Sequence, residues 1–296
     1  MRTLTLTIPP ELDGRRVKSV LQYRLRIPPS MIARIKLRPA GIRLNGVRCR
    51  TTDTVRTGDE LSAEVGDLPR ETGIVPIPCP LSVLYEDEDL LVIDKPAGMA
   101  THGKALRGDV TVAAALAARY GTDRPFHPVT RLDRGTSGLM VAAMSGYAHE
   151  LLRRKLHTAD FIREYLALVR GAPPEAGGSI TLPLRKDETA VNRFRVAPDG
   201  LAARTDYTLL ETRGGMSLLR LRLFTGRTHQ IRVHLAALGC PVWGDRVYGE
   251  AAEDIARPAL HSAFLYLRQP VTGAVIDLSS PLPGDMEALW RSMRSK

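Results

Sequence analysis

The sequence predicts an α+β protein in two parts, a small N-terminal module over residues 1–70 and a larger domain over residues 81–296. Two observations support this prediction. Beyond residue 80, patterns typical of strands do not alternate regularly with helical ones, which argues against a doubly wound parallel fold. Residues 67–80 carry four prolines, a composition typical of a stiff, extended segment, so we expect a linker over 71–80.

The N-terminal module is expected to combine short helices with short strands. Its predicted elements are an edge strand within 1–10, helices through 17–25 and 32–37, a strand pair around residue 45, and a strand over 61–65. Ser30 follows two prolines and is the expected N-cap of the second helix. Asn45 and Gly46 predict a tight turn between the paired strands.

Positive charge is concentrated in one block between Arg15 and Arg56. This segment holds twelve basic residues and a single acidic one, so its net charge is +11, whereas the whole chain carries +10. Surface charge normally mixes signs, so the block predicts binding to nucleic acid, with a merely solvated basic surface as the alternative. We expect the nucleic-acid contacts to come from Arg34, Lys36, Arg38 and Asn45.

The larger domain is expected to be mostly strand. Its predicted strands are 81–85, 90–94, 139–144, 163–169, 193–196, 203–210, 217–223 and 274–278. Its predicted helices are 110–120, 146–156, 228–238 and 285–293. Asp94 to Gly98 (Asp-Lys-Pro-Ala-Gly) follows a predicted strand and favours a rigid basic loop.

Several classes of protein are excluded by the pattern of apolar and metal-binding residues. No apolar run approaches membrane-spanning length, and the N-terminus does not resemble a signal peptide. The three cysteines are far apart, so a disulfide framework or thiolate zinc site is not expected. His229 and His234 are five apart and diverge on a helix, which argues against a metal site. We therefore expect a cytoplasmic, soluble, metal-free monomer.

One loop places a carboxylate among cations just before a buried strand. Asp133 lies between Arg131 and Arg134, and Gly135 and Gly138 lead into the apolar run 139–144. Flanking cations favour the charged form of a carboxylate. We interpret Asp133 as a group for covalent or electrostatic chemistry on a nucleic acid. The alternative is an aspartate that caps the turn or pairs with Arg131.

Two further segments are candidates for the same site. In the helix expected from Thr228, His229 and Arg232 share a face that suits an anion or a carboxylate, and a solvated polar face is the alternative. Tyr165 lies in an alternating strand and suits stacking on a base removed from its helix, with an ordinary core aromatic as the alternative. His261 is interpreted as a structural histidine.

These segments, in this order, resemble the RluA-type family of RNA pseudouridine synthases over roughly the whole chain beyond residue 80. The quoted pieces are Asp94-Lys-Pro-Ala-Gly98, Arg131-Leu-Asp-Arg-Gly-Thr-Ser-Gly-Leu139, Glu164-Tyr-Leu-Ala-Leu-Val-Arg-Gly171, Gly226-Arg-Thr-His-Gln-Ile-Arg-Val-His234 and Gly244-Asp-Arg-Val-Tyr-Gly249. The basic module resembles the S4-like RNA-binding domain that many of these enzymes carry. The sequence departs from the family at Thr130, where His is common, and at Gly135, where an acidic residue is common.

The resemblance implies a fold, a reaction and residue roles. It implies a large mixed, mostly antiparallel sheet and isomerisation of uridine to pseudouridine in RNA, most plausibly large-subunit ribosomal RNA, with no metal or redox cofactor. Asp133 matches the essential aspartate, Tyr165 the tyrosine that lies on the target base, and Arg232 the arginine that pairs with the aspartate. Arg131 matches a residue that helps to hold the RNA open, and we expect Arg134 and His229 to contact RNA as well. The carboxylate acts either as a nucleophile or in a route through a glycal.

Competing functions remain open at this point. A transfer-RNA pseudouridine synthase would share the same residues. A non-catalytic RNA-binding ribosome-assembly factor would use the basic module alone, and the joint presence of Asp133, Tyr165 and Arg232 argues against it. A glycosidase acting on nucleosides would release free uracil.

Overall fold

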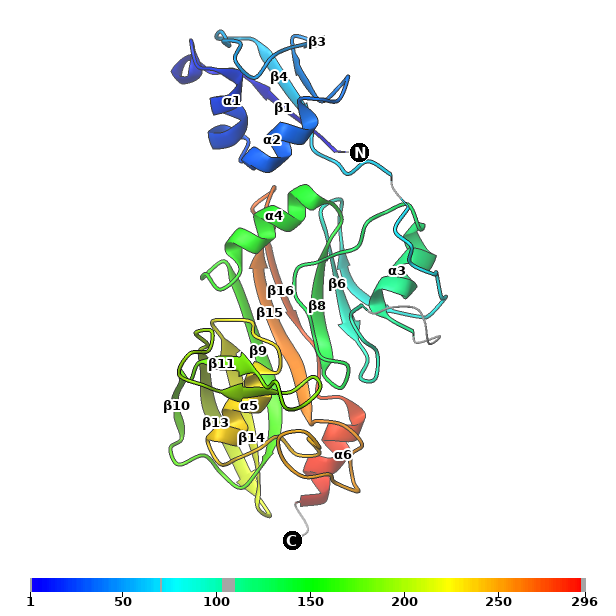
Figure 1. The fold of residues 1–296 in the computed structure, drawn as a ribbon, viewed down its shortest axis with the longest axis vertical. Coiled ribbons are helices and arrows are strands. Elements are labelled where there is room, and N and C mark those ends of the chain that lie inside the picture. Colours follow the sequence, from blue (N-terminus) through cyan, green and yellow to red (C-terminus); the bar gives the residue numbers. More distant parts are fainter. Residues whose placement is uncertain (1, 70, 103–109, 294–296) are drawn as a thin grey trace.

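The computed structural model describes residues 2–69, 71–102 and 110–293. Figure 1 shows an elongated molecule, with the N-terminal module at one end of the long axis and the larger part of the chain below it. Each part contains its own sheet and its own buried apolar cluster. No helix within the described residues is long and apolar enough to cross a membrane.

The N-terminal module is a four-stranded antiparallel sheet with helical turns packed on it. The strand order is β1-β4-β2-β3, so β1 lies at an edge as expected. The elements are β1 (Thr3–Thr7), η1 (Pro10–Leu12), α1 (Val17–Ser19), the π-helix η2 (Val20–Arg24), α2 (Pro29–Ile35), β2 (Ile42–Leu44), β3 (Val47–Arg48) and β4 (Glu60–Glu64). The tight turn at Asn45 and Gly46 is confirmed, since it joins β2 to β3 with both residues at positive φ.

The predicted N-cap of the second helix is wrong. Helix α2 begins at Pro29, and its N-cap is Pro28 rather than Ser30. Proline is well tolerated at the first helical position because its fixed φ suits the helix and its missing N–H would have had no partner there. The two prolines therefore start the helix and do not merely precede it.

The larger sheet has ten strands, and its main path runs β10-β13-β14-β9-β15-β8-β6-β5. Strand β16 also pairs with β15, and β7 with β8. Within the described residues every pairing of named strands is antiparallel except that of β8 with β15, so the expected mixed, mostly antiparallel sheet is confirmed. Its strands are β5 (Ser82–Glu86), β6 (Leu90–Lys95), β7 (His127–Pro128), β8 (Ser137–Ala143), β9 (Phe161–Arg170), β10 (Gly177–Ile180), β13 (Thr205–Arg213), β14 (Met216–Leu223), β15 (Leu260–Arg268) and β16 (Val275–Ser279).

Apolar side chains cover both faces of this sheet at β6 and β8. Alternate residues of β6, such as Leu91 and Val92, belong to separate clusters on opposite faces. Helix α3 (Val112–Tyr120) packs on one face and α4 (Gly146–Lys155) on the other. Thr111 and Ser145 cap these helices by accepting backbone hydrogen bonds. Burial on both faces makes these strands continuous apolar runs rather than alternating ones.

The remaining elements are α5 (Gln230–Ala237), α6 (Gly284–Ser292) and a separate hairpin of β11 (Leu184–Lys186) and β12 (Phe194–Val196). The central strand β15 was not predicted, because its residues Leu260 to Ala263 are all buried and show no alternation. The short strands β7, β10 and β11 were not predicted either. The helix expected from Thr228 begins at Gln230, because His229 adopts a left-handed backbone conformation, with φ of 57°.

The N-terminal module contacts the larger part of the chain through α4. Tyr147 and Leu151 of α4 belong to the module's apolar cluster, and the Tyr147 hydroxyl donates to the carbonyl of Leu25 at 3.0 Å. The Asp67 carboxylate accepts from Gly146 N at 2.8 Å and lies 2.7 Å from His127 Nε2. The proline-rich segment is therefore tied to the larger part at its beginning, and no helix or strand occurs in its described residues.

Candidate active site

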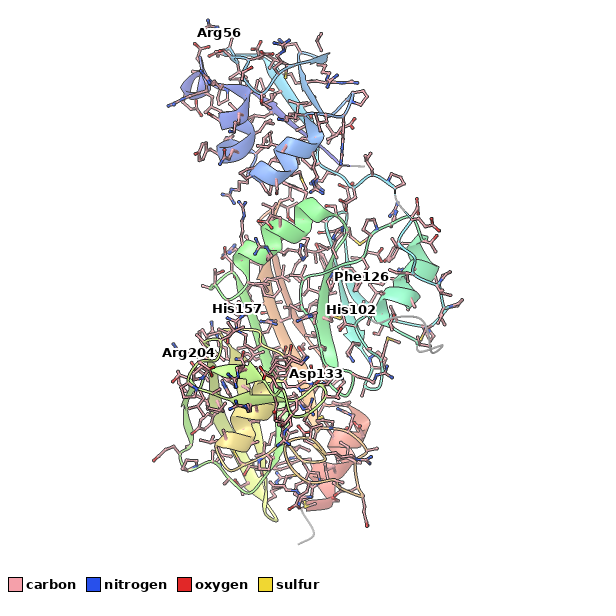
Figure 2. The ribbon with its side chains drawn as sticks, in the orientation of Figure 1. Arg56, His102, Phe126, Asp133, His157 and Arg204 are labelled. Carbon is pink, nitrogen blue, oxygen red and sulfur yellow. The ribbon has the colours of Figure 1, made fainter. Side chains whose placement is uncertain are left out.

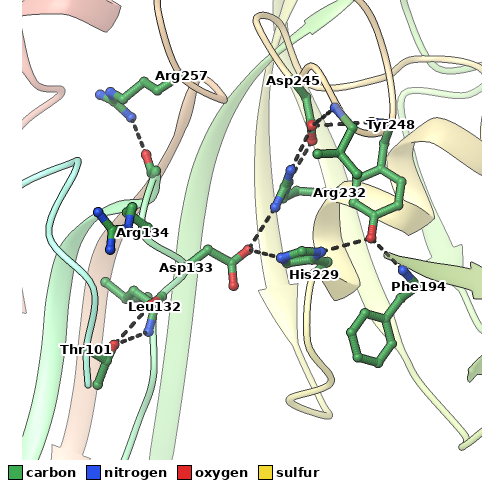
Figure 3. Close-up of polar contacts among 12 residues, drawn as sticks. Thr101, Leu132, Asp133, Arg134, Phe194, His229, Arg232, Asp245, Tyr248 and Arg257 are labelled. Carbon is green, nitrogen blue, oxygen red and sulfur yellow. Dashed lines mark hydrogen bonds and ion pairs between the residues drawn. The ribbon is translucent and has the colours of Figure 1, made fainter. Parts of the chain in front are cut away.

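Asp133 lies in the loop that enters β8, where β8 meets β15 in the parallel pairing. The backbone N–H of Thr136 donates to the Asp133 carbonyl at 3.1 Å and closes the turn. The Thr101 hydroxyl donates to the Leu132 carbonyl at 3.0 Å, as Figure 3 shows, and Gly98 N donates to the Arg134 carbonyl at 2.8 Å. The loop is therefore held by the segment after β6, and the carboxylate has a fixed backbone.

Two glycines of this loop are required by close packing. Gly138 has φ of +108°, and a Cβ at that position would lie 2.2 Å from the carbonyl oxygen of Ser262 in β15. A Cβ at Gly135 would lie 2.9 Å from Cδ of Pro258. An acidic side chain at residue 135, common in the family that the sequence resembles, would therefore have to displace Pro258. Glycine lets the loop and β15 approach each other closely enough to form the site.

Arg232 links Asp133 to a second, fully buried carboxylate. One guanidinium nitrogen of Arg232 donates to Asp133 Oδ2 at 3.4 Å, and two others donate to the Asp245 oxygens at 2.6 and 2.7 Å. The side chain of Asp245 is 0% exposed and that of Arg232 8%, against 28% for Asp133. Burial opposes the charge on Arg232, but the hydrogen bonds and charge of Asp245 outweigh it and raise the pKa of Arg232. The expected contact with Asp133 is present, but the shorter, bidentate pair is with Asp245.

His229 makes the second contact to Asp133. Its Nε2 lies 3.8 Å from Asp133 Oδ2, and its Nδ1 lies 2.8 Å from the Tyr248 hydroxyl (Figure 3). That hydroxyl accepts a hydrogen bond from Phe194 N at 2.8 Å, which leaves its own hydrogen free to be donated to Nδ1. Burial lowers the pKa of His229, although the charge of Asp133 opposes this shift. A neutral ring that accepts at Nδ1 carries its proton on Nε2 and presents it to Asp133.

Helix α5 carries Arg232, His229 is its N-cap residue, and the polar side chains Arg232 and His234 of the helix are buried. Arg232 and His234 are 6% and 0% exposed, so the alternative of a solvated polar face is wrong. His234 Nδ1 lies 2.9 Å from the Thr205 hydroxyl, and its Nε2 lies 2.9 Å from the Leu182 carbonyl. His234 therefore shares no partner with His229, which contacts Asp133 and Tyr248.

Tyr165 and Asp133 line one cavity of about 380 Å³. Tyr165 lies on β9, is 4% exposed, and borders the cavity from the sheet side. Arg131 and Arg134, which flank Asp133, also line it. His229 and Arg232 line an adjoining cleft that shares Asp133 and Tyr165 with the cavity. The structure thus brings together the three predicted catalytic residues and the three predicted RNA contacts of the larger domain, within the size range of ligand pockets.

The position of Lys95 corrects the prediction of a rigid basic loop after β6. Its side chain is fully buried, and its ammonium donates to the carbonyls of Pro96 at 2.9 Å, Met99 at 2.8 Å and Arg134 at 3.5 Å. Burial lowers the pKa of Lys95 to about 8, while the nearby charge of Asp133 acts in the opposite direction. Lys95 therefore joins the loops beneath Asp133 through these carbonyls and is not exposed at the surface. His261 is buried between the Ser137 hydroxyl and the Ser280 carbonyl, as expected of a structural histidine.

The predicted contacts of the N-terminal module divide into two kinds. Arg34 and Lys36 are exposed on and beside α2. Arg38 donates to the Gly66 carbonyl at 2.8 Å, and Asn45 bonds to Asp59 and Glu60 N, each at 2.8 Å, so both side chains already serve the module's own structure. Figure 2 places Arg56 at the far end of the module and Asp133 well below it, so that end of the module lies away from the cavity.

Asp245 and Tyr248 were not predicted as residues of the site. Both lie in the Gly244-Asp-Arg-Val-Tyr-Gly249 segment, which was quoted for the resemblance but given no role. A charged residue three positions before a tyrosine, between two glycines, was the available signal. Their contacts with Arg232 and His229 form only because the fold brings this segment against α5 and its N-cap.

Comparisons with known proteins identify the family of this chain. The model of the family described as RNA pseudouridylate synthase matches residues 89–237. The chain is 33% identical to "Uncharacterized RNA pseudouridine synthase YhcT" of Bacillus subtilis, over 98% of this chain and 97% of that protein. It is 36% identical to "Ribosomal large subunit pseudouridine synthase D" of Xanthomonas campestris, over 97% of this chain and 91% of that protein.

A solved structure shares the fold of the larger part. The structure titled "Human RNA Pseudouridylate Synthase Domain Containing 1" aligns with a TM-score of 0.55 and 28% identity, covering 73% of this chain and 96% of that one. The α+β architecture with its large, mostly antiparallel sheet is therefore shared with known members of this class of protein.

Proposed function

The chain belongs to the RNA pseudouridylate synthase family, and from this premise we propose that it is an RluA-type enzyme that modifies large-subunit ribosomal RNA. Membership makes it an RNA pseudouridine synthase, an enzyme of the isomerase class. The choice of ribosomal RNA is supported by its 36% identity to a relative named "Ribosomal large subunit pseudouridine synthase D". An RNA-binding N-terminal module also favours this target over transfer RNA.

We propose that Asp133 is the essential catalytic carboxylate. The observation that carries this proposal is its position in the cavity, with Arg232 at 3.4 Å and His229 at 3.8 Å on the same carboxylate oxygen. Both contacts hold the carboxylate in the cavity, where it can attack the sugar or base, or assist elimination to a glycal.

The reaction rearranges one nucleotide without adding or removing atoms. The bond between N1 of uracil and C1′ of ribose breaks, the base turns, and a bond forms between C5 and C1′. The proton on C5 is lost and N1 gains one. Because uracil leaves and returns within one site, the pocket needs to hold the free base and to exclude water. No redox cofactor enters this balance.

Tyr165 is proposed to hold the target base. A uracil inside an RNA helix cannot reach Asp133, so the nucleotide must be extruded at a cost of about a few kcal/mol. Stacking on an aromatic ring offsets part of that cost. Tyr165 supplies such a ring at the cavity wall. Arg131 and Arg134 at the mouth are proposed to hold the opened RNA strand.

The N-terminal module is proposed to be an S4-like RNA-binding domain over residues 1–70, followed by a linker over 71–80 and the catalytic domain over 81–296. Exposed cations of this module, Arg34 and Lys36 among them, supply affinity that depends on salt and little on sequence. Selectivity then comes from the cavity and from the shape of the RNA.

The test is to map pseudouridine in total RNA from cells with and without the gene, by base-specific chemical probing. We expect one or more sites in large-subunit ribosomal RNA to disappear and to return with the wild type but not with Asp133→Asn. The variant should still bind RNA, which separates catalysis from binding. A change in transfer RNA alone would refute the ribosomal target, and release of free uracil would indicate a glycosidase.

A further inference from the structure

Arg163 is a buried cation with no carboxylate partner among the described residues. It lies on β9 two residues before Tyr165, is 7% exposed, and borders the same cavity as Asp133. Within residues 2–69, 71–102 and 110–293 no ion pair to Arg163 is present, and its guanidinium makes one long contact, 3.5 Å to Nδ1 of His157. The guanidinium lies at the cavity wall, where an anionic ligand can supply the counter-charge that no described residue provides.

The surroundings of Arg163 are positive and open to the cavity. Arg227, at the start of the motif that leads to α5, lines the cavity together with His157. Much of the His157 side chain is exposed, but its ring is partly shielded from water. This partial burial and the charges of Arg163 and Arg227 lower the pKa of His157 to about 4. The ring is therefore neutral at physiological pH and adds no charge. Gly226 lies beside both side chains, since a Cβ there would lie 3.7 Å from the His157 ring and 3.8 Å from the guanidinium of Arg163.

We propose that Arg163 and Arg227 bind an RNA backbone phosphate next to the target uridine. The proposal rests on the proposed function, because it assumes that the base occupies the space beside Tyr165. Residues two apart on a strand point to the same face and are separated by about 7 Å. A base over Tyr165 thus leaves its sugar-phosphate within reach of Arg163. Arginine suits this role because its planar fork donates to two phosphate oxygens at once.

The charge distribution in the cavity favours a phosphate at this end. Asp133, Arg131 and Arg134 form one wall, and Arg163 and Arg227 belong to strand β9 and the segment before α5. Asp133 is the one carboxylate among the residues that line the cavity, so a phosphate is repelled from its oxygens and is attracted to Arg163, which has no carboxylate partner among the described residues. Arg227 also lines the cleft beside Asp133. With the phosphate at Arg163 and Arg227 and the base over Tyr165, the sugar would lie next to the catalytic carboxylate.

The test measures binding of small probes to the full-length protein at low ionic strength, by titration followed with NMR. The probes are uridine, uridine 3′,5′-bisphosphate and inorganic phosphate. We expect the wild type to bind the bisphosphate at least tenfold more tightly than uridine. Arg163→Gln and Arg227→Gln should each lose most of that advantage while binding uridine as the wild type does. Arg220→Gln, which removes a charge from the neighbouring strand β14 outside the cavity, is the matched control.

Stability separates a binding role from a structural one. Removing an unpaired buried charge should leave the melting temperature of the free protein unchanged or higher, so Arg163→Gln should fold. A clear fall in its melting temperature, or a bisphosphate advantage equal to that of the wild type in both variants, would overturn the proposal. Inorganic phosphate binding as tightly as the bisphosphate would also overturn it, by indicating a free-phosphate site. Bisphosphate binding that persists in a chain without isomerase activity would refute the proposed function and leave this site standing.

Discussion

The pair formed by Arg232 and Asp245 offers a direct test of how burial sets the energy of the site. Asp245 accepts two hydrogen bonds from Arg232 and one each from Val247 N at 3.0 Å and Tyr248 N at 3.3 Å. In Asp245→Asn an amide N–H₂ would face the guanidinium in place of an oxygen. Arg232 would then keep Asp133 as its remaining carboxylate partner among the described residues.

The chain contains a matched control with the same geometry and a different exposure. Arg257 makes two hydrogen bonds of 2.7 Å to Asp285, whose side chain is 44% exposed, and it also donates to the carbonyls of Gly135, Pro258 and Leu260. Breaking a buried pair by removing one partner costs about 3 to 5 kcal/mol. An exposed pair contributes about 0.2 to 1 kcal/mol. Asp245→Asn should therefore destabilise the protein several times more than Asp285→Asn.

The assay is urea denaturation followed by tryptophan fluorescence. Both tryptophans, Trp243 and Trp290, lie in the larger part of the chain and report its unfolding. Nearly equal bond lengths in the two pairs mean that geometry predicts equal losses and burial predicts unequal ones. If Asp285→Asn costs as much free energy of unfolding as Asp245→Asn, the argument that burial makes Arg232 depend on Asp245 is refuted.

Three further predictions concern other parts of the molecule. Gly138→Ala should cost about 3 kcal/mol or more in urea denaturation because its Cβ meets Ser262, whereas Gly215→Ala, with φ of +78° and open space around it, should cost about 1 to 2 kcal/mol; equal losses would contradict this. Burial lowers the pKa of His234 and His261, so the unfolded chain binds more protons than the folded one below about pH 6.5. The free energy of unfolding should therefore be fully retained above that pH and lower at pH 5.5, by at most about 1.4 kcal/mol per pH unit for each histidine. An unchanged free energy of unfolding at pH 5.5 would disprove their neutral burial. Replacing the exposed Arg43 and Arg50 by Gln should lower the slope of log affinity for RNA against log salt by about 0.7 to 0.9 per lost contact, and an unchanged slope would remove these residues from the interface.

Local patterns predicted most of the elements because they depend on neighbours in the chain. Asn45 and Gly46 specify their turn through backbone conformations that few other residues adopt. The strands with alternating or continuous apolar runs, such as β9 and β8, were recognised for the same reason. The order of the strands was not predictable from such patterns, and β15 was missed although it joins the two halves of the sheet.

The sequence by itself determined that Asp133 lies in a basic, glycine-containing loop before a buried strand and that a strongly positive module precedes it. Only the tertiary structure decided that Arg232 binds Asp245 more closely than Asp133, that Tyr248 contacts His229, and that Arg163 borders the cavity without a carboxylate partner among the described residues. The physical reason is that these contacts join residues from separate strands and loops. Their distances and burial depend on how β8, β9 and α5 pack, which no local pattern contains.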